Sequence, residues 1–130
     1  MQLTKVITSL IQVAFGLQKP LLTMMIIPIS NKKQQKILGT TAVRNLKQFE
    51  STCELKRMYV LRDFRRLRLG QKLLDTAIGF AKSIGYSRIV LDSSKMLYAA
   101  RALYQKNGFV DIPRYNDNYR ADVFMERRLT

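Results

Sequence analysis

The stretch that decides the fold runs from Glu54 to Phe109 and reads ELKRMYVLRDFRRLRLGQKLLDTAIGFAKSIGYSRIVLDSSKMLYAARALYQKNGF. Its first part, Glu54–Val60, predicts a strand, and the basic turn Arg65–Gly70 leads directly into an amphipathic helix. Backbone N–H groups at a helix N-terminus have no intrahelical partner, and the helix dipole favours negative charge there. The turn therefore predicts an anion site, and we expect a phosphorylated ligand on it.

The composition indicates one globular domain with an anionic partner. The chain has 130 residues, 47% of them hydrophobic, which is enough for a single core. It carries 23 Lys and Arg against 9 Asp and Glu, a net charge of +14. Such a balance fits a phosphorylated cofactor, a nucleic acid or an acidic surface, and charge alone does not choose among them.

The chain contains no histidine and a single cysteine, Cys53. These absences exclude a Ser-His or Cys-His nucleophile within the chain and a His-ligated zinc, so we predict no metal site. One cysteine permits no intrachain disulfide, which fits a reducing compartment and leads us to expect a cytoplasmic protein. Acid–base chemistry falls to carboxylates, tyrosines, lysines or water.

The N-terminal segment Met1–Phe15 has apolar residues at helical spacing. The run is too short and interrupted for a membrane span, and it lacks the basic start and cleavage site of a signal peptide. We therefore expect an uncleaved core helix, ended by Gly16 and Pro20, so that residues 1–20 form an atypical N-terminal helix.

From residue 21 onward the pattern changes to that of strands. Thr23–Ile29 and Lys36–Leu46 read as a hairpin around the polar turn Ser30–Gln35. A second polar segment leads to a third strand, Cys53–Leu61. Residues 21–61 therefore predict a three-stranded antiparallel meander.

The central helix has the clearest pattern in the chain. Its apolar stripe consists of Leu69, Leu73, Leu74, Ala77, Ile78 and Ala81. Gly85 follows at a position suited to a left-handed cap. The short apolar strand Arg88–Leu91 comes next, and a right-handed crossover makes it parallel to the strand before the helix.

A second helix is expected over Lys95–Lys106, with Asn107 and Gly108 as its stop. The residues expected to cap its start are Asp92, Ser93 and Ser94. Two last strands flank a polar loop, over Phe109–Ile112 and Ala121–Leu129. The turn and helices occupy residues 62–108 and the last strands residues 109–130, so the chain predicts one α/β (α+β) domain with a mixed, mostly antiparallel twisted sheet and flanking helices.

This order of elements resembles the GNAT superfamily of acetyl-CoA-dependent N-acetyltransferases. The resemblance covers about residues 39–129. It rests on Glu54–Val60, Phe64–Gly70, the leucine-rich helix, Ala100–Phe109 and Tyr115–Glu126. It implies that the central parallel strands splay apart, and that an acetyl group moves from coenzyme A to a primary amine by direct attack.

The resemblance also implies a cofactor site. The pyrophosphate would be wrapped by the backbone of Arg65, Arg66, Leu67, Arg68, Leu69, Gly70 and Gln71, with the pantetheine arm along Met58 and Val60. Lys106 would meet the 3′-phosphate, and Ser94 would touch the cofactor. At Arg68 the family usually has glycine, which tolerates positive φ. Arginine there adds a cation near the phosphates but also crowds the turn.

For catalysis, Glu54 matches the position that some members use for a general base, and Tyr104 matches a tyrosine that often protonates the departing thiolate. The plainer alternatives are a solvated strand glutamate and a core tyrosine. Tyr115, Asn116 and Asp117 lie on the loop that borders the acceptor site in the family, so we expect them to contact the substrate. Cys53, beside Glu54, is expected to be a buried thiol.

The segment before the hairpin is shorter than the strand and two helices usual in the family. The first strand is missing or the N-terminal helix replaces it, and an exposed sheet edge could then pair with another subunit in a homodimer. Two other functions stay open: a catalytically degenerate protein that binds coenzyme A, and a basic nucleic-acid-binding module. The second explains the charge but not the ordered motifs.

Overall fold

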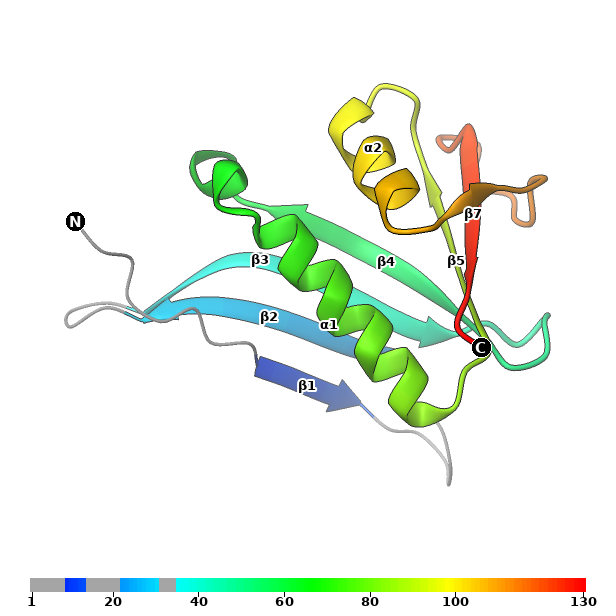
Figure 1. Ribbon diagram of the computed structural model, residues 1–130, viewed down its shortest axis with the longest axis horizontal. Coiled ribbons are helices and arrows are strands. Elements are labelled where there is room, and N and C mark those ends of the chain that lie inside the picture. The colour runs from blue at the N-terminus through cyan, green and yellow to red at the C-terminus, as the bar shows by residue number, and fades with distance from the viewer. Residues whose placement is uncertain (1–8, 14–21, 31–34) are drawn as a thin grey trace.

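The structure is a computed structural model that describes the backbone of residues 9–13, 22–30 and 35–130, with side chains from residue 38 onward except those of residues 66 and 67. The elements are β1 (Ser9–Val13), β2 (Leu22–Ser30), β3 (Gln35–Asn45), β4 (Thr52–Val60), the 3₁₀ helix η1 (Arg62–Leu67), α1 (Leu69–Ile84), β5 (Arg88–Ser93), α2 (Tyr98–Lys106), β6 (Val110–Asp111) and β7 (Val123–Arg128). The described strands form one sheet in the order β1-β2-β3-β4-β5-β7-β6. In Figure 1, α1 crosses this sheet, and α2 lies at the end where β4 and β5 diverge.

The N-terminal prediction is wrong where the structure can test it. Ser9–Val13 is a strand, antiparallel to β2, with Ser9 opposite Ile26 and Val13 opposite Leu22. The rest of the expected helix lies outside the described residues. Ile11 and Val13 are β-branched and suit a strand, and pairing with the edge of β2 overrides the local helical spacing. A strand therefore precedes the hairpin, and the edge predicted to be open belongs to β1 instead of β2.

The antiparallel meander is confirmed. β2 pairs with β3 from Leu22 opposite Arg44 to Ser30 opposite Gln35, and β3 pairs antiparallel with β4. The middle of the predicted turn, residues 31–34, lies outside the described residues. Cys53, on β4, is buried, as expected, and its thiol donates to the Arg88 carbonyl at 3.7 Å.

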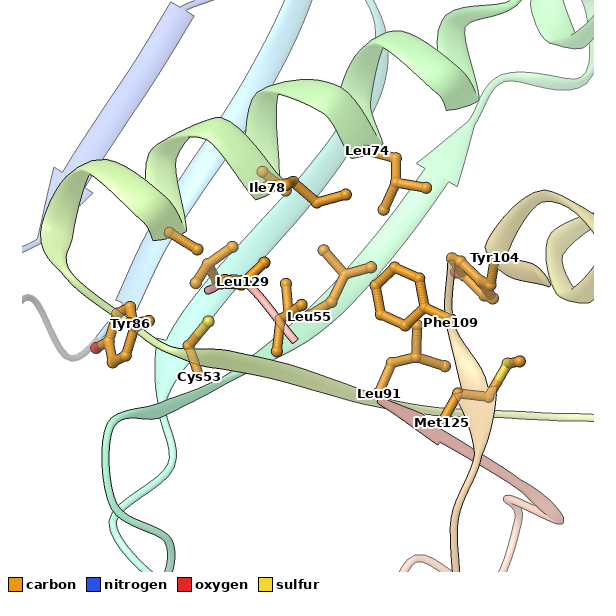
Figure 2. Packing of buried hydrophobic residues seen from close by; sticks show 14 of the residues in the cluster. Cys53, Leu55, Leu74, Ile78, Tyr86, Leu91, Tyr104, Phe109, Met125 and Leu129 are labelled. Carbon is orange, nitrogen blue, oxygen red and sulfur yellow. The ribbon is translucent and has the colours of Figure 1, made fainter. Parts of the chain in front are cut away.

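Helix α1 packs its predicted stripe against the sheet. All six predicted residues are buried, Leu73 and Leu74 completely. Burying a leucine contributes roughly 2 kcal/mol, so the stripe fixes the helix on the sheet. Figure 2 shows Leu74 and Ile78 above Leu55 and Cys53 of β4.

Glycine is required at both ends of this packing. A Cβ on Gly39 of β3 would lie 2.9 Å from the Tyr59 carbonyl oxygen and 3.0 Å from Cδ1 of Leu73, so the bare backbone lets α1 approach. Gly85 ends α1 with φ 101°, and its N–H donates to the Lys82 carbonyl at 3.0 Å. The predicted left-handed cap is confirmed.

The second half of the chain completes the sheet. β5 pairs parallel with β4, and β7 pairs antiparallel with β5 on one side and β6 on the other, as the predicted closing strands require. Helix α2 begins at Tyr98, later than predicted, and ends at Lys106 as predicted. Met96, inside the predicted range, precedes the helix and is 75% exposed.

Candidate active site

The site is organised by a fork between the two parallel strands. β4 and β5 pair only from Thr52 opposite Arg88 to Leu55 opposite Leu91, and residues 56–60 of β4 continue without pairing to β5. The two strands visibly separate beyond this point in Figure 1. We call this separation the fork. It has the splayed geometry that the family resemblance implied.

A bulge in β4 lies at the start of the fork. The pairing of β3 with β4 shifts between Thr40 and Ala42, and Arg57 has a φ of 56°. The buried Thr41 hydroxyl donates to the Lys56 carbonyl at 3.2 Å, which holds the bulged backbone. A bulge bends a strand and increases its twist, so it directs β4 away from β5. The sequence carries no signal for it, because arginine is an unusual residue at positive φ.

The basic turn contains η1 and a single residue, Arg68, before α1. Arg68 has φ 59° and ψ 27° and offers no side-chain cap to the helix. The first helical hydrogen bond runs from the Lys72 N–H to the Arg68 carbonyl, at 3.2 Å. By helix geometry the amides of Leu69, Gly70 and Gln71 precede that bond and have no intrahelical acceptor. They are the donors that the sequence predicted for a phosphate.

Arg65, on η1, extends its side chain back to the end of β4. Its Nε donates to the Val60 carbonyl at 2.9 Å, and its guanidinium lies 5.5 Å from the centre of the Tyr59 ring. Val60 is one of the two positions predicted to lie along the pantetheine arm, and its carbonyl already has a donor. Met58 is partly buried against the hydrophobic core. Of the other turn residues, Arg66 and Leu67 have side chains outside the described set.

Gln71 joins α1 to the end of α2. Its amide donates to the Asn107 side chain at 2.7 Å, and the Asn107 amide donates back at 2.9 Å. Asn107 also donates to the Leu103 carbonyl at 2.8 Å. The side chain of Gln71 is therefore a structural link between two helices, while its backbone amide stays at the start of α1.

Tyr104 lies in the core on α2, 5% exposed. It belongs to the same cluster as Leu55 and Leu91, the last pair before the fork, and packs against Phe109 with ring centres 5.7 Å apart (Figure 2). Burial raises the pKa of the Tyr104 hydroxyl to about 12. The hydroxyl therefore keeps its proton at neutral pH and can donate it.

Ser94 and Lys106, two further residues predicted to contact the cofactor, make no described contact with the other predicted cofactor residues. Ser94 accepts the Met96 N–H at 3.2 Å in the turn before α2, and Lys106 is exposed in the last turn. The expected capping of α2 by Asp92, Ser93 and Ser94 is wrong, because the cap residue is Leu97 and no side chain caps the helix.

Glu54 is fully buried and paired on the opposite face of the sheet from α1. Alternation along β4 puts it there, because its neighbours Cys53 and Leu55 belong to the core under α1. Its Oε1 accepts from Arg44 Nε at 2.8 Å, and its Oε2 accepts from the Tyr115 hydroxyl at 2.6 Å. Lys56 Nζ lies 3.6 Å from Oε2, and the Glu54 side chain has 0% exposure.

Asp92, one position beyond the last β4–β5 pair, forms the other half of this network. Lys56 Nζ donates to both of its oxygens at 3.2 Å, and Asn116 and Asn118 donate to Oδ2 at 2.7 and 3.3 Å. Burial alone would raise the pKa of the Asp92 carboxyl, but the Asn116 hydrogen bond and the charge of Lys56 outweigh it, so the pKa is lowered. Each strand of the fork thus contributes one paired carboxylate.

The predicted acceptor residues lie on a loop held against this network. We call residues 113–120 the acceptor loop. An open hollow of about 510 Å³ is lined by Gln48, Arg114, Tyr115, Asn116 and Asp117. The structure therefore brings the three predicted acceptor residues together at one hollow. Arg44, Lys56 and Asn118 belong to the network and were missed by sequence reasoning.

The two sides of the fork are thus formed by different elements and carry different polar groups. One side, predicted to bind the cofactor and called the cofactor side, comprises η1, the start of α1 and α2. The other, predicted to bind the amine and called the acceptor side, comprises the Glu54–Asp92 network and the acceptor loop. Residues 10–109 match the sequence profile of the Acetyltransferase (GNAT) family. The chain belongs to the GNAT acetyltransferase family.

Individual GNAT proteins agree with this assignment. An uncharacterized N-acetyltransferase of Dictyostelium discoideum is 35% identical over 79 residues, which are 59% of this chain and 37% of that protein. A GNAT acetyltransferase structure from Staphylococcus aureus Mu50 has a TM-score of 0.74 at 27% identity, covering 84% of this chain and 69% of that one. A putative acyl-CoA N-acyltransferase from Klebsiella pneumoniae has a TM-score of 0.70 at 26% identity, covering 85% and 74%.

The chain spans little more than a third of the length of the curated relatives it matches, 37% and 34% for the first two. Within the part of the chain that the structure describes, no helix combines the length and apolarity that a membrane crossing requires.

Proposed function

We propose that the protein uses acetyl-CoA to acetylate a primary amine by direct attack. The observation that carries the proposal is the fork, which opens beside the start of α1, where amides that lack intrahelical acceptors follow a basic turn. Acyl-CoA use follows from family membership, and the acetyl group is our choice within that class. Acetyl-CoA would supply an activated thioester.

The residues on the cofactor side fit such a ligand. The amides of Leu69, Gly70 and Gln71, which have no acceptor within α1, provide donors for a pyrophosphate, and Arg68 adds an exposed cation. Lys106 at the end of α2 is available to a 3′-phosphate. We assign the arm of the cofactor to the part of β4 that does not pair with β5, at Met58 and Val60, where a backbone amide can also act as an oxyanion donor.

Tyr104 is the proposed proton donor to the departing sulfur. Its hydroxyl is protonated at neutral pH, because burial raises its pKa to about 12. It shares a hydrophobic cluster with the residues at the start of the fork, so it lies close to the proposed thioester position.

We propose that a water molecule, and not Glu54 directly, removes the proton from the attacking amine. A general base must lie within hydrogen-bond reach of the proton that it removes. Glu54 has no exposed surface, and its two oxygens accept from Arg44 and Tyr115. The proposed acceptor contacts remain Tyr115, Asn116 and Asp117.

A calorimetric titration tests the cofactor assignment. We expect saturable binding of acetyl-CoA and weaker binding of dephospho-CoA, because the second lacks the phosphate assigned to Lys106. Equal affinities would remove the role of Lys106, and no heat with either ligand would contradict cofactor binding. Random-sequence DNA at two salt concentrations is the comparison for the nucleic-acid alternative, which requires strongly salt-dependent binding.

A second candidate is a coenzyme A-binding protein without catalysis. The burial of Glu54 favours it, because the carboxylate at the expected base position is inaccessible. Turnover of acetyl-CoA with a panel of primary amines separates the two, since the degenerate protein binds the cofactor but releases no free thiol. We also propose a cytoplasmic location and a homodimer paired through the β1 edge, to be tested by fractionation and by light scattering.

A further inference from the structure

We propose that Glu54 is a positioning residue: through Tyr115 it holds the acceptor loop against β4 and so sets the shape of the acceptor hollow. The catalytic consequence rests on the proposed function. The contact itself joins residues 61 positions apart and can be tested without any activity.

Glu54 acts as an anchor, by which we mean that its carboxylate binds the acceptor loop to the sheet. Its carboxylate is completely buried, and its two oxygens receive hydrogen bonds from different parts of the chain, Arg44 on β3 and Tyr115 on the acceptor loop. A buried carboxylate with partners on both oxygens is stable where it lies, whereas the loss of a partner leaves an unsatisfied charge. The bond from Tyr115 therefore stabilises the loop in the position against β4 that the structure shows.

Contacts of its ring and backbone hold Tyr115 in position for this hydrogen bond. Its ring lies edge-on to Phe49 and to Phe124, with centres 6.2 and 5.4 Å away. Burial and the hydrogen bond to Glu54 raise the pKa of the Tyr115 hydroxyl well above its usual value, so the hydroxyl remains the donor. Its backbone carbonyl accepts from Gln48 Nε2 at 2.8 Å, which fixes the same residue to the turn before β4.

A second anchor lies on the other strand of the fork. Asn116 and Asn118 donate to Asp92 of β5, and Lys56 Nζ lies between the two carboxylates, 3.6 Å from Glu54 and 3.2 Å from Asp92. The acceptor loop is thus fastened to both strands that form the fork.

Limited proteolysis tests the anchor directly. Trypsin can cut after Arg114 and Arg120, and Arg114 is held in the closed loop by the carbonyls of Asn118 and Ala121. Tyr115→Phe removes only the hydroxyl and keeps the ring. We expect it to raise the rate of cleavage at these two sites about tenfold, the equivalent of one hydrogen bond to a charged group.

Tyr119→Phe is the matched control, because it removes a hydroxyl from the same loop but at a side chain that is 83% exposed. Its cleavage rate should equal that of the unmodified protein. Glu54→Gln should behave as Tyr115→Phe does, and the double variant should be no faster than either single one. Cleavage that is unchanged in Tyr115→Phe overturns the anchor, whether or not Glu54→Gln folds.

Kinetics distinguish an anchor from a base. With a positioning role, both variants raise the KM for the amine, by roughly tenfold, while kcat and acetyl-CoA affinity stay near those of the unmodified protein. The pH profile of kcat/KM keeps its shape. A loss of kcat on the order of a hundredfold in Glu54→Gln alone, with the acidic limb of the profile removed, would identify Glu54 as the base and overturn the proposal.

The two proposals fail separately. If the unmodified protein acetylates no amine, the proposed function fails, while faster cleavage of Tyr115→Phe still supports the anchor. If it acetylates an amine but the loop of Tyr115→Phe is cleaved at the same rate as that of the unmodified protein, the proposed function stands and the anchor is wrong.

Discussion

The cofactor side and the acceptor side of the fork differ in how their polar groups are satisfied. At the start of α1 the amides of Leu69, Gly70 and Gln71 precede the first helical hydrogen bond, and Arg68 provides no cap. Across the sheet, the carboxylates of Glu54 and Asp92 are fully paired with side chains of the protein. Substitutions on the cofactor side should therefore change ligand binding or turnover, and substitutions on the acceptor side should change stability first.

The largest expected effect on stability comes from Glu54→Leu. It deprives Arg44, Lys56 and Tyr115 of a shared buried acceptor, and breaking a buried ion pair typically destabilises by about 3 kcal/mol or more. Urea unfolding measures the change. Glu126→Leu is the control, because its pair with Arg88 is about 20% exposed on both sides and should contribute about 1 kcal/mol. Equal losses would contradict the special role of the acceptor-side network.

Tyr104→Phe is expected to separate turnover from stability. The ring keeps its packing on Phe109, so cofactor affinity and unfolding free energy should stay close to those of the unmodified protein. Loss of a positioned proton donor should lower kcat roughly a hundredfold. Steady-state acetylation and a cofactor titration measure the two quantities. An unchanged kcat would make Tyr104 a core residue and leave water as the donor.

Arg68→Gly should stabilise the fold but weaken the binding of acetyl-CoA. Arg68 occupies the left-handed region at φ 59°, which glycine adopts without strain, so the variant should gain about 1 kcal/mol in unfolding free energy. Removal of the cation should weaken acetyl-CoA binding by about 1 kcal/mol. Lys72→Gly, an exposed position inside α1, is the control and should destabilise instead. Tighter cofactor binding by Arg68→Gly would show that the arginine obstructs the site.

The smallest expected effect is on how the stability of the protein depends on pH in acid. The pKa of Asp92 is lowered in the folded protein, so its contribution to stability is present above the ordinary aspartate pKa of about 4 and is lost as the pH falls through the lowered value. Asp92→Asn should therefore unfold with a shallower dependence on pH below about 4. Thermal melts across this range measure the slope, and parallel curves for the two proteins would assign acid sensitivity to other groups.

Local patterns predicted helix α1 and its two ends well. The six-residue stripe of α1 follows a 3.6-residue period within a single element, and Gly85 stands where a left-handed cap is needed. The unusual Arg68 was recognised in the sequence because a residue with a Cβ stands where glycine is usual. Its positive φ then follows from the turn geometry.

Distant contacts explain what sequence reasoning missed. Glu54 meets Tyr115 across 61 residues and Lys56 meets Asp92 across 36, and no periodicity encodes such pairings. The strand β1 escaped prediction for the same reason, since its identity depends on pairing with β2. Asp92 looked like a cap for α2 because only its chain neighbours were visible in the sequence.

The bridge between Gln71 and Asn107 joins two uncharged amides. Neither protonation nor added salt changes such a bond directly, whereas an ion pair at the same place would be screened by salt and would compete with an incoming phosphate. In a chain with a net charge of +14, this bridge between α1 and α2 carries no charge of its own, although the Gln71 amide also donates to the Asp75 carboxylate at 2.8 Å. The spacing between the two helices can therefore stay constant while the charge around the turn changes.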